Sequence, residues 1–134
     1  MKASLVDTNI LSLFFRGHSQ VVVKFEAYLA EYDTINLSMI TYYEIVSGLK
    51  HRDAQKQLDQ FLEFSLQNTI VPLTQEAADV AANVYADLRK KGQPIDDIDL
   101  LIAGTAIANG LVVITQNRKH FDRITELEVE DWSE

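Results

Sequence analysis

Short apolar runs alternate along this chain with longer segments of helical periodicity. The runs at 3–6, 34–38, 70–73 and 111–115 are predicted strands, and 126–130 forms a weaker fifth. Helices are expected directly after Asp7 and over 21–30, 41–49, 54–66, 75–91 and 97–108. Parallel strands need crossover connections, which helices supply, so the pattern predicts an α/β fold with a parallel sheet flanked by helices. At 134 residues the chain has the length of one domain, 1–134.

The spacing also predicts finer features of these elements. Pro72 suggests that the strand at 70–73 lies at an edge of the sheet. The helix over 21–30 is expected to gather Val22, Phe25 and Leu29 on one side, and the helix over 75–91 carries the apolar stripe Ala77, Ala81, Val84 and Leu88. Asp96 or Asp97 is expected to cap the helix that ends at 108.

The composition excludes several classes of site. The chain has no cysteine, which rules out disulfides, zinc–cysteine sites and thiol nucleophiles. Its formal charge is −8, which argues against non-specific binding of polyanions, so a nucleic-acid function would have to be local and assisted by metal. Five acids and no base lie between 126 and 134, and we expect a solvated acidic tail there.

Residues 100–117 carry no charge and could suggest a membrane span. Asn109-Gly110 interrupts this stretch, which we divide into a helix over 100–108 and a strand over 111–115. The N-terminus reaches Asp7 before a signal-peptide core of useful length forms. We therefore expect no membrane segment and a cytoplasmic protein.

Acidic and polar residues stand just beyond the predicted strands. Asp7 follows the first strand, Glu44 lies shortly after the second, and Asp99 begins the apolar helix that precedes the fourth. Thr115 and Asn117 come at the end of that fourth strand. In open parallel sheets, ligands bind outside the carboxyl ends of the strands. These residues, distant in sequence, are therefore predicted to meet at one edge of the sheet.

Three carboxylates at one site repel one another. At about 4 Å and an effective dielectric constant of about 20, each pair costs roughly 4 kcal/mol. A hard divalent cation removes this repulsion, and oxygen ligands favour Mg²⁺ or Mn²⁺. Asp7, Glu44 and Asp99 are therefore the predicted metal-binding residues.

Each position also has a purely structural interpretation. Asp7 could cap a helix, Glu44 could complete a capping box with Thr41, and the acids at 96–99 suit the positive end of a helix. Asn117 could be a simple cap or turn residue. The functional interpretation therefore depends on the whole set.

The same residues fall in segments that resemble PIN-domain ribonucleases, most closely the VapC toxins of bacterial and archaeal toxin–antitoxin pairs. The matching segments are 5–10, 38–45 with Gly48, 92–103, 113–117 with Phe121, and Asp131-Trp132. They occur in the family's order and cover essentially the whole chain.

The resemblance implies about five parallel strands and metal-dependent cleavage of RNA. It identifies Asp7, Glu44 and Asp99 as the acidic triad, Asn117 as the fourth position and Thr115 as the accompanying hydroxyl. Asp96, a supporting residue, stands where close relatives often have glycine. We expect Asp7 and Asp99 to ligate Mg²⁺ directly, Glu44 to do so directly or through water, and the amide oxygen of Asn117 to hold a water or a second metal. In-line attack of water would then leave a 5′-phosphate.

Three basic clusters could hold the RNA: 50–52, 89–91 and 118–120. Residues 89–91 end a helix, where cations complement its dipole. Arg118 and Lys119 directly follow the predicted site, so we expect them to contact phosphates.

Three alternatives differ in chemistry. His18, His51 and His120 could act as acid and base without metal, leaving cyclic phosphates. A phospho-acceptor signalling module would share the fold class, but the strand at 70–73 ends without an aspartate. A PIN scaffold could also bind a partner without turnover.

The segment 14–29 carries more apolar residues than a short helical pair needs: Phe14, Phe15, 21–23, Phe25, Tyr28 and Leu29. The conservative interpretation is core. By resemblance, part of this surface would receive a VapB-type antitoxin or a second protomer, so we expect a homodimer that also binds a cognate antitoxin.

Overall fold

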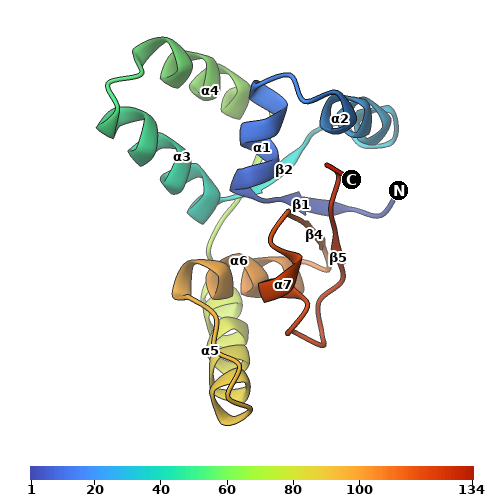
Figure 1. Cartoon of the computed structure of the whole chain (residues 1–134), viewed down its shortest axis with the longest axis vertical. Coiled ribbons are helices and arrows are strands. Elements are labelled where there is room, and N and C mark those ends of the chain that lie inside the picture. The colour runs from blue at the N-terminus through green and yellow to red at the C-terminus, as the bar shows by residue number, and fades with distance from the viewer.

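A computed structural model describes all 134 residues (Figure 1). The strands are β1 (Ser4–Val6), β2 (Asn36–Ser38), β3 (Thr69–Val71), β4 (Val112–Ile114) and β5 (Val129–Glu130). The helices are α1 (Thr8–Phe15), α2 (Ser19–Glu31), α3 (Met39–His51), α4 (Gln55–Gln67), α5 (Gln75–Lys90), α6 (Asp97–Ala108) and α7 (Arg118–Phe121). The predicted alternation of strands and helices is confirmed, and α7 is an additional short helix.

All strand pairings are parallel, but they form two hydrogen-bonded groups, β1-β4-β5 and β2-β3. β1 and β2 lie side by side without a backbone ladder. On this side of β1, the Ser4 N–H donates to the Tyr28 hydroxyl at 3.1 Å, and the Ser4 carbonyl accepts from Asn36 Nδ2 at 3.0 Å. Side chains therefore replace ladder hydrogen bonds between β1 and β2, and one continuous five-stranded ladder is not formed.

β3 lies at the edge of its pair, as predicted from Pro72, which follows it directly. Proline lacks the N–H that a further strand would require, so the chain leaves the sheet at this point.

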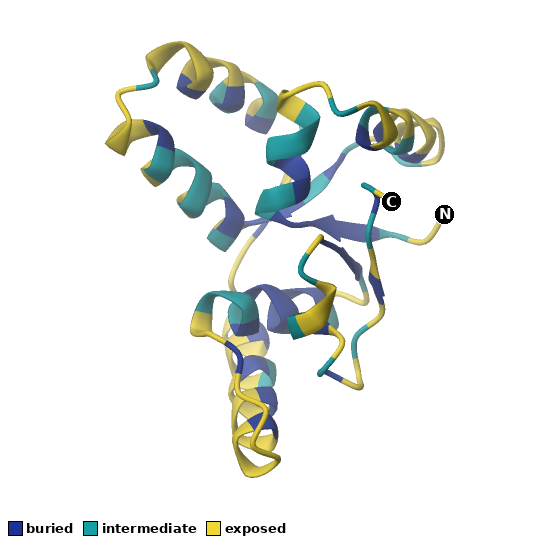
Figure 2. Ribbon diagram, viewed as in Figure 1, coloured by how far each residue is buried: buried dark blue, intermediate teal, exposed yellow.

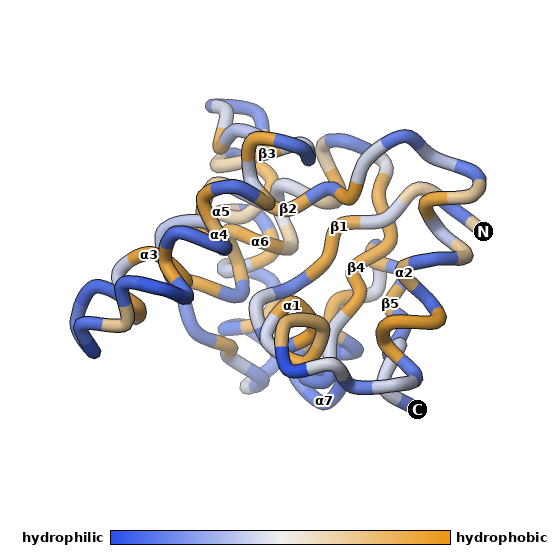
Figure 3. Tube along the Cα trace, turned by 90° about the horizontal axis from the view of Figure 1, so that it is seen from above, coloured by the Kyte–Doolittle hydropathy of each residue, from blue (hydrophilic) through white to orange (hydrophobic).

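Two apolar cores lie on opposite faces of the strands (Figures 2 and 3). Leu5 and Val113 pack with α5 and α6 in one core, whereas Val6 and Ile114 pack with α1, α2 and α4 in the other. This separation follows from the alternation of side chains along a strand. The helices therefore cover both faces of the sheet.

The acidic C-terminal segment is not the solvated tail that we expected. Val129 is buried in β5, and Trp132 is 1% exposed, with its ring edge-to-face against Phe25. The acids of this segment lie between apolar residues that enter the core. The prediction of a solvated tail was wrong because it used the number of charges alone.

The buried face of α2 also differs from the expectation. Val21, Phe25 and Tyr28 are buried, whereas Val22 is half-buried and Leu29 is 44% exposed. Both sets of residues have helical spacing, and the Tyr28 hydroxyl can be buried because it accepts the Ser4 N–H. Most of the apolar surplus is therefore internal.

Phe14 stacks on Phe25 with ring centroids 4.2 Å apart, so Phe14 also packs against the core. Of the residues considered for partner binding, Phe15, Val23 and Leu29 stay exposed.

The uncharged stretch divides as predicted into α6 and β4, which Asn109 and Gly110 separate. None of the helices is both long enough and apolar enough to span a bilayer.

The predicted stripe of α5, consisting of Ala77, Ala81, Val84 and Leu88, is fully confirmed as buried. It packs on α6 at Gly104, where a Cβ atom would collide with the Ala77 carbonyl and lie 2.9 Å from the Ala81 Cβ. The close approach of the two backbones therefore requires glycine.

Gly104→Ala is expected to lower the free energy of unfolding by about 1–3 kcal/mol, because overpacking must separate the two helices. Urea denaturation measures this change. Gly48→Ala is the matched control, since a Cβ there meets only Arg52 Nη1 at 3.6 Å. That control is expected to be stabilised by roughly 0.5–1 kcal/mol. Equal stability of the two variants would contradict the close-packing explanation.

Candidate active site

Asp7 joins β1 to α1 and is only 5% exposed. Its Oδ1 accepts the Thr8 N–H at 2.8 Å, which makes it the N-cap of α1, and its Oδ2 accepts the Thr115 hydroxyl at 2.8 Å. The capping role considered from the sequence is therefore correct, but it uses one carboxylate oxygen only. The second oxygen ties α1 to the end of β4.

Glu44 lies on α3 and does not form the capping box with Thr41 that its spacing suggested. Ser38 caps α3 instead, and its hydroxyl accepts the Thr41 N–H at 3.0 Å. Glu44 lies further along the helix, where its Oε1 accepts the Thr8 hydroxyl at 2.7 Å. Its carboxylate is thus directed to the residue next to Asp7.

Asp99 lies in the first turn of α6, which Asp96 caps by accepting the Asp99 N–H at 2.9 Å. The prediction that Asp96 or Asp97 caps this helix is confirmed for Asp96. Asn117 Nδ2 donates to Asp99 Oδ2 at 3.1 Å, and His120 Nδ1 lies 3.5 Å from the same oxygen. Asn117 therefore uses its amide nitrogen to hold this carboxylate, and the role expected of its amide oxygen, to hold a water or a second metal, stays a prediction.

Hydrogen bonds connect these groups in one chain. It begins at Glu44, which accepts the Thr8 hydroxyl, and Thr8 donates its N–H to Asp7. Asp7 also accepts the Thr115 hydroxyl, which itself accepts the Asn117 N–H at 2.9 Å. The chain ends where the Asn117 side-chain amide donates to Asp99. The structure thus brings Asp7, Glu44, Asp99, Thr115 and Asn117 together at the carboxyl ends of β1, β2 and β4.

The electrostatics reflect this convergence. Burial raises the pKa of Asp7 to about 6, and the Asp99 and Glu44 carboxylates add to this effect, although hydrogen bonds from Thr115 and Thr8 oppose it. Burial and then the Asp96 carboxylate raise the pKa of Asp99, while His120 lowers it in part. The site therefore disfavours its own ionised carboxylates.

No three acidic or histidine side chains lie close enough together to ligate one ion directly. Mg²⁺ keeps several waters and is usually held by only one or two protein carboxylates. The donors here are carboxylate oxygens that repel one another in a partly desolvated setting. Their chemistry fits a hard, hydrated cation, with some of them acting through water.

The two predicted RNA-binding residues lie on α7, directly after Asn117. Arg118 Nε forms an ion pair with Asp122 at 3.5 Å, whereas Lys119 is exposed without a carboxylate partner. Because Arg118 is partly neutralised by its neighbour, Lys119 is the freer of the two cations.

The sequence interpretation did not single out Thr8, Asn9 or the contact made by His120. Asn9 Nδ2 donates to Thr115 Oγ1 at 3.3 Å, and its Oδ1 accepts the Gln116 N–H at 3.1 Å. For Thr8 and Asn9, the only sequence signal of a role at the site was their position directly after Asp7. His120 could be placed only through the three-dimensional path of α7.

The parallel α/β fold and its acidic edge define a known class of domain. A family model described as "PIN domain" matches residues 4–127, and the chain belongs to this family.

Within the family, the chain is similar to curated and solved VapC proteins. It is 30% identical over 130 residues to "Ribonuclease VapC1" of Haemophilus influenzae, covering 96% of this chain and 97% of the relative. It is 28% identical over 130 residues to "tRNA(fMet)-specific endonuclease VapC" of Shigella flexneri, with the same coverage. The crystal structure of DNA-bound VapBC from Salmonella typhimurium matches with a TM-score of 0.86 and 28% identity, covering 98% of this chain and 99% of that one. The resemblance recognised in the sequence is confirmed.

Asp7→Asn is expected to stabilise the protein at neutral pH. A rise of the pKa from 3.8 to about 6 corresponds to a penalty of about 3 kcal/mol for holding the ionised carboxylate in the folded state. Between these values the folded protein retains a proton that the unfolded chain releases, so this penalty grows as pH rises from about 4 to about 6. At pH 7.5 the free energy of unfolding of the variant should rise by up to this amount. The weaker hydrogen bonds from Thr115 and Thr8 to the new amide reduce the gain.

Urea denaturation at pH 4 and pH 7.5 measures this difference. Asp79→Asn, which removes an exposed carboxylate without a side-chain partner on α5, is the control. An Asp7→Asn variant less stable than the native chain by the same amount at both pH values would contradict the predicted burial penalty.

Proposed function

We propose that the chain is a metal-dependent endoribonuclease of the VapC type that acts as the toxin of a toxin–antitoxin pair. The observation that supports this most strongly is the hydrogen-bonded chain from Glu44 to Asp99 around the buried Asp7. The names of the VapC relatives supply the reaction class.

Asp7, Asp99 and Glu44 would hold Mg²⁺, or Mn²⁺ in its place. When bound, the ion supplies acidification of a water and neutralisation of charge on the phosphate. Asp7 is fixed in position by the Thr8 N–H and the Thr115 hydroxyl. The Asn117 amide orients Asp99, and Asp96 holds the first turn of α6 from which Asp99 projects. These contacts reduce the reorganisation needed during the reaction.

Glu44 has one oxygen engaged by Thr8, which leaves Oε2 able to accept a hydrogen bond from water. Water oriented in this way would attack phosphorus in line as the bond between phosphorus and the 3′ oxygen breaks. One product would then carry a 5′-phosphate and the other, once its leaving oxygen takes a proton from water, a 3′-hydroxyl. A mechanism that relies on histidines alone lacks a second histidine at the site. His18 caps α2 and His51 ends α3, and only His120 contacts the acidic residues.

Asp99→Asn is expected to reduce Mg²⁺-dependent cleavage by about 10³-fold, because it removes several kcal/mol of charge stabilisation. Asn117→Ala should reduce it by roughly 10–100-fold, since it only frees Asp99 from its hydrogen bond. Cleavage of transfer RNA is the first assay, given the name of the Shigella relative, with sequencing of the 5′ ends.

Asp97→Asn, the same substitution at an exposed position in the same helical turn, controls for loss of charge and is expected to retain activity. Full activity of Asp99→Asn, or cleavage that persists in excess EDTA with cyclic phosphate ends, would overturn the mechanism. A folded native chain that binds RNA but never cleaves it would support a non-catalytic binding module instead.

The VapBC complex of the Salmonella relative supports a VapB-type antitoxin as partner, and we also propose a homodimer. Light scattering of the purified protein at high micromolar concentration is expected to give twice the 15.2 kDa chain mass. A monomer under these conditions would contradict the homodimer.

A further inference from the structure

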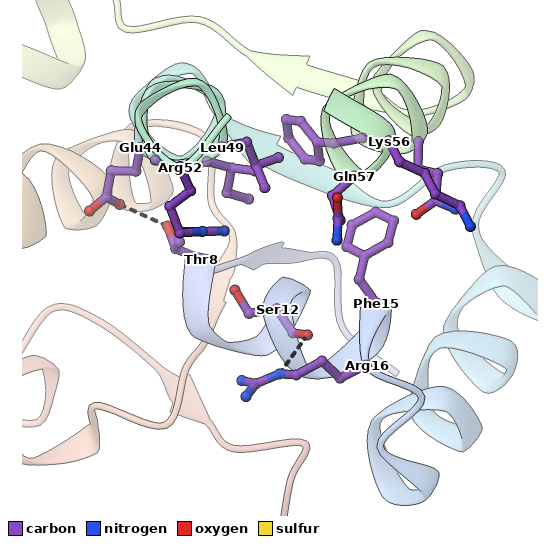
Figure 4. Close-up of a pocket in the computed structure, with 13 residues that line it drawn as sticks. Thr8, Ser12, Phe15, Arg16, Glu44, Leu49, Arg52, Lys56 and Gln57 are labelled. Carbon is purple, nitrogen blue, oxygen red and sulfur yellow. Dashed lines mark hydrogen bonds between the residues drawn. The ribbon is translucent and has the colours of Figure 1, made fainter. Parts of the chain in front are cut away.

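A groove of about 660 Å³ lies between α1, α3 and α4 (Figure 4). One end is formed by Thr8 and Glu44, the hydrogen-bonded pair at the acidic site. Ser12 and Gly48 line the groove one helical turn further along α1 and α3, and Lys56 on α4 lines it as well. The groove is thus continuous with the candidate active site.

Cations gather in this groove although the chain as a whole carries a charge of −8. Arg16, Arg52 and Lys56 line it, and Glu44 is its only acid. None of the three cations has a carboxylate within 4 Å, whereas Arg118 on α7 is paired with Asp122. Unpaired cations in a groove that opens onto a phosphodiester-cleaving site are suited to bind phosphates.

Arg52 folds back along its own helix. Its Nη1 lies 3.6 Å from the position that a Cβ of Gly48 would occupy, one turn earlier on α3. Arg16 donates from Nε to the Ser12 carbonyl at 3.3 Å and keeps its terminal nitrogens free of protein acceptors. Both guanidiniums therefore have donors available for an anionic ligand.

The groove also offers an aromatic surface. Phe15 lines it and is 42% exposed, and its ring is held edge-on against Phe61 and Phe64 with centroid separations of 6.0 and 5.1 Å. Gln57 and Gln60 add amide groups. A rigid exposed ring beside cations and amides is the combination that binds single-stranded nucleic acid.

We propose that this groove holds the RNA strand adjacent to the scissile phosphate, with its phosphates on Arg16, Arg52 and Lys56 and one base stacked on Phe15. The proposal rests on the proposed ribonuclease function. An endonuclease must guide its substrate on both sides of the cleaved bond. The hydrogen-bonded chain of the site ends at Glu44 on the groove side and at Asn117 and Asp99 on the side of α7, where Lys119 is available.

The test compares Arg52→Gln, Lys56→Gln and Phe15→Leu on a 5′-labelled single-stranded RNA in Mg²⁺, at several salt concentrations. Each loss of charge should raise KM several-fold and make the dependence of log(kcat/KM) on log[salt] shallower by about 0.7. Phe15→Leu should raise KM by roughly five-fold or more without changing that slope. Lys90→Gln, an exposed lysine at the end of α5 away from the groove, is the matched control and should change neither quantity.

The proposal is overturned if the slope of log(kcat/KM) against log[salt] in both Arg52→Gln and Lys56→Gln equals the native slope. The groove would then be a binding site for a protein segment instead of RNA. If the native chain does not cleave RNA, the proposed function fails, and fluorescence anisotropy with the same RNA still tests the groove through the same slopes. An absence of RNA binding by the native chain would overturn both.

Discussion

The rest of the site depends on the two hydrogen bonds that the Asp7 carboxylate accepts. One oxygen caps α1 and the other accepts the Thr115 hydroxyl, so the same group fixes the start of a helix and its distance from the end of β4. Burial makes its ionised form unfavourable, and the nearby Asp99 and Glu44 carboxylates increase that penalty. The fold therefore holds a strained electrostatic arrangement that two hydrogen bonds only partly relieve, and a divalent cation would complete this relief.

The junction between β1 and β2 shows how the fold holds this arrangement in place. Tyr28 and Asn36 satisfy the Ser4 backbone where a sheet ladder would otherwise run. The two strands stay adjacent, and the helices that follow them, α1 and α3, approach closely enough for Thr8 to reach Glu44. Buried side-chain hydrogen bonds of this kind specify one relative position of two strands, because an alternative register would leave the same polar groups unsatisfied.

Periodicity and strand-end position predicted much of this structure, and the failures share a cause. The α5 stripe follows from spacing alone, and Asp7 stands beyond its strand as parallel-sheet topology requires. The buried face of α2 could not be chosen from spacing, because it depends on the Ser4 N–H that Tyr28 accepts. The direction of the Asn117 amide likewise depends on Asp99, 18 residues away. Local patterns predict elements, whereas the partner of a polar group is set by tertiary contacts.

Charge is separated along the groove and the site in a way that suits a polyanionic substrate. The carboxylates concentrate where a cation would neutralise them, and the unpaired Arg52 and Lys56 lie further along the same groove. Under the proposed function, the acidic end without metal would repel phosphate and only the cations would attract it, whereas with metal both parts would favour the strand. The affinity of the groove for RNA and the affinity of the site for metal would then be coupled through the field between them. Each ligand would favour the other although no residue need contact both.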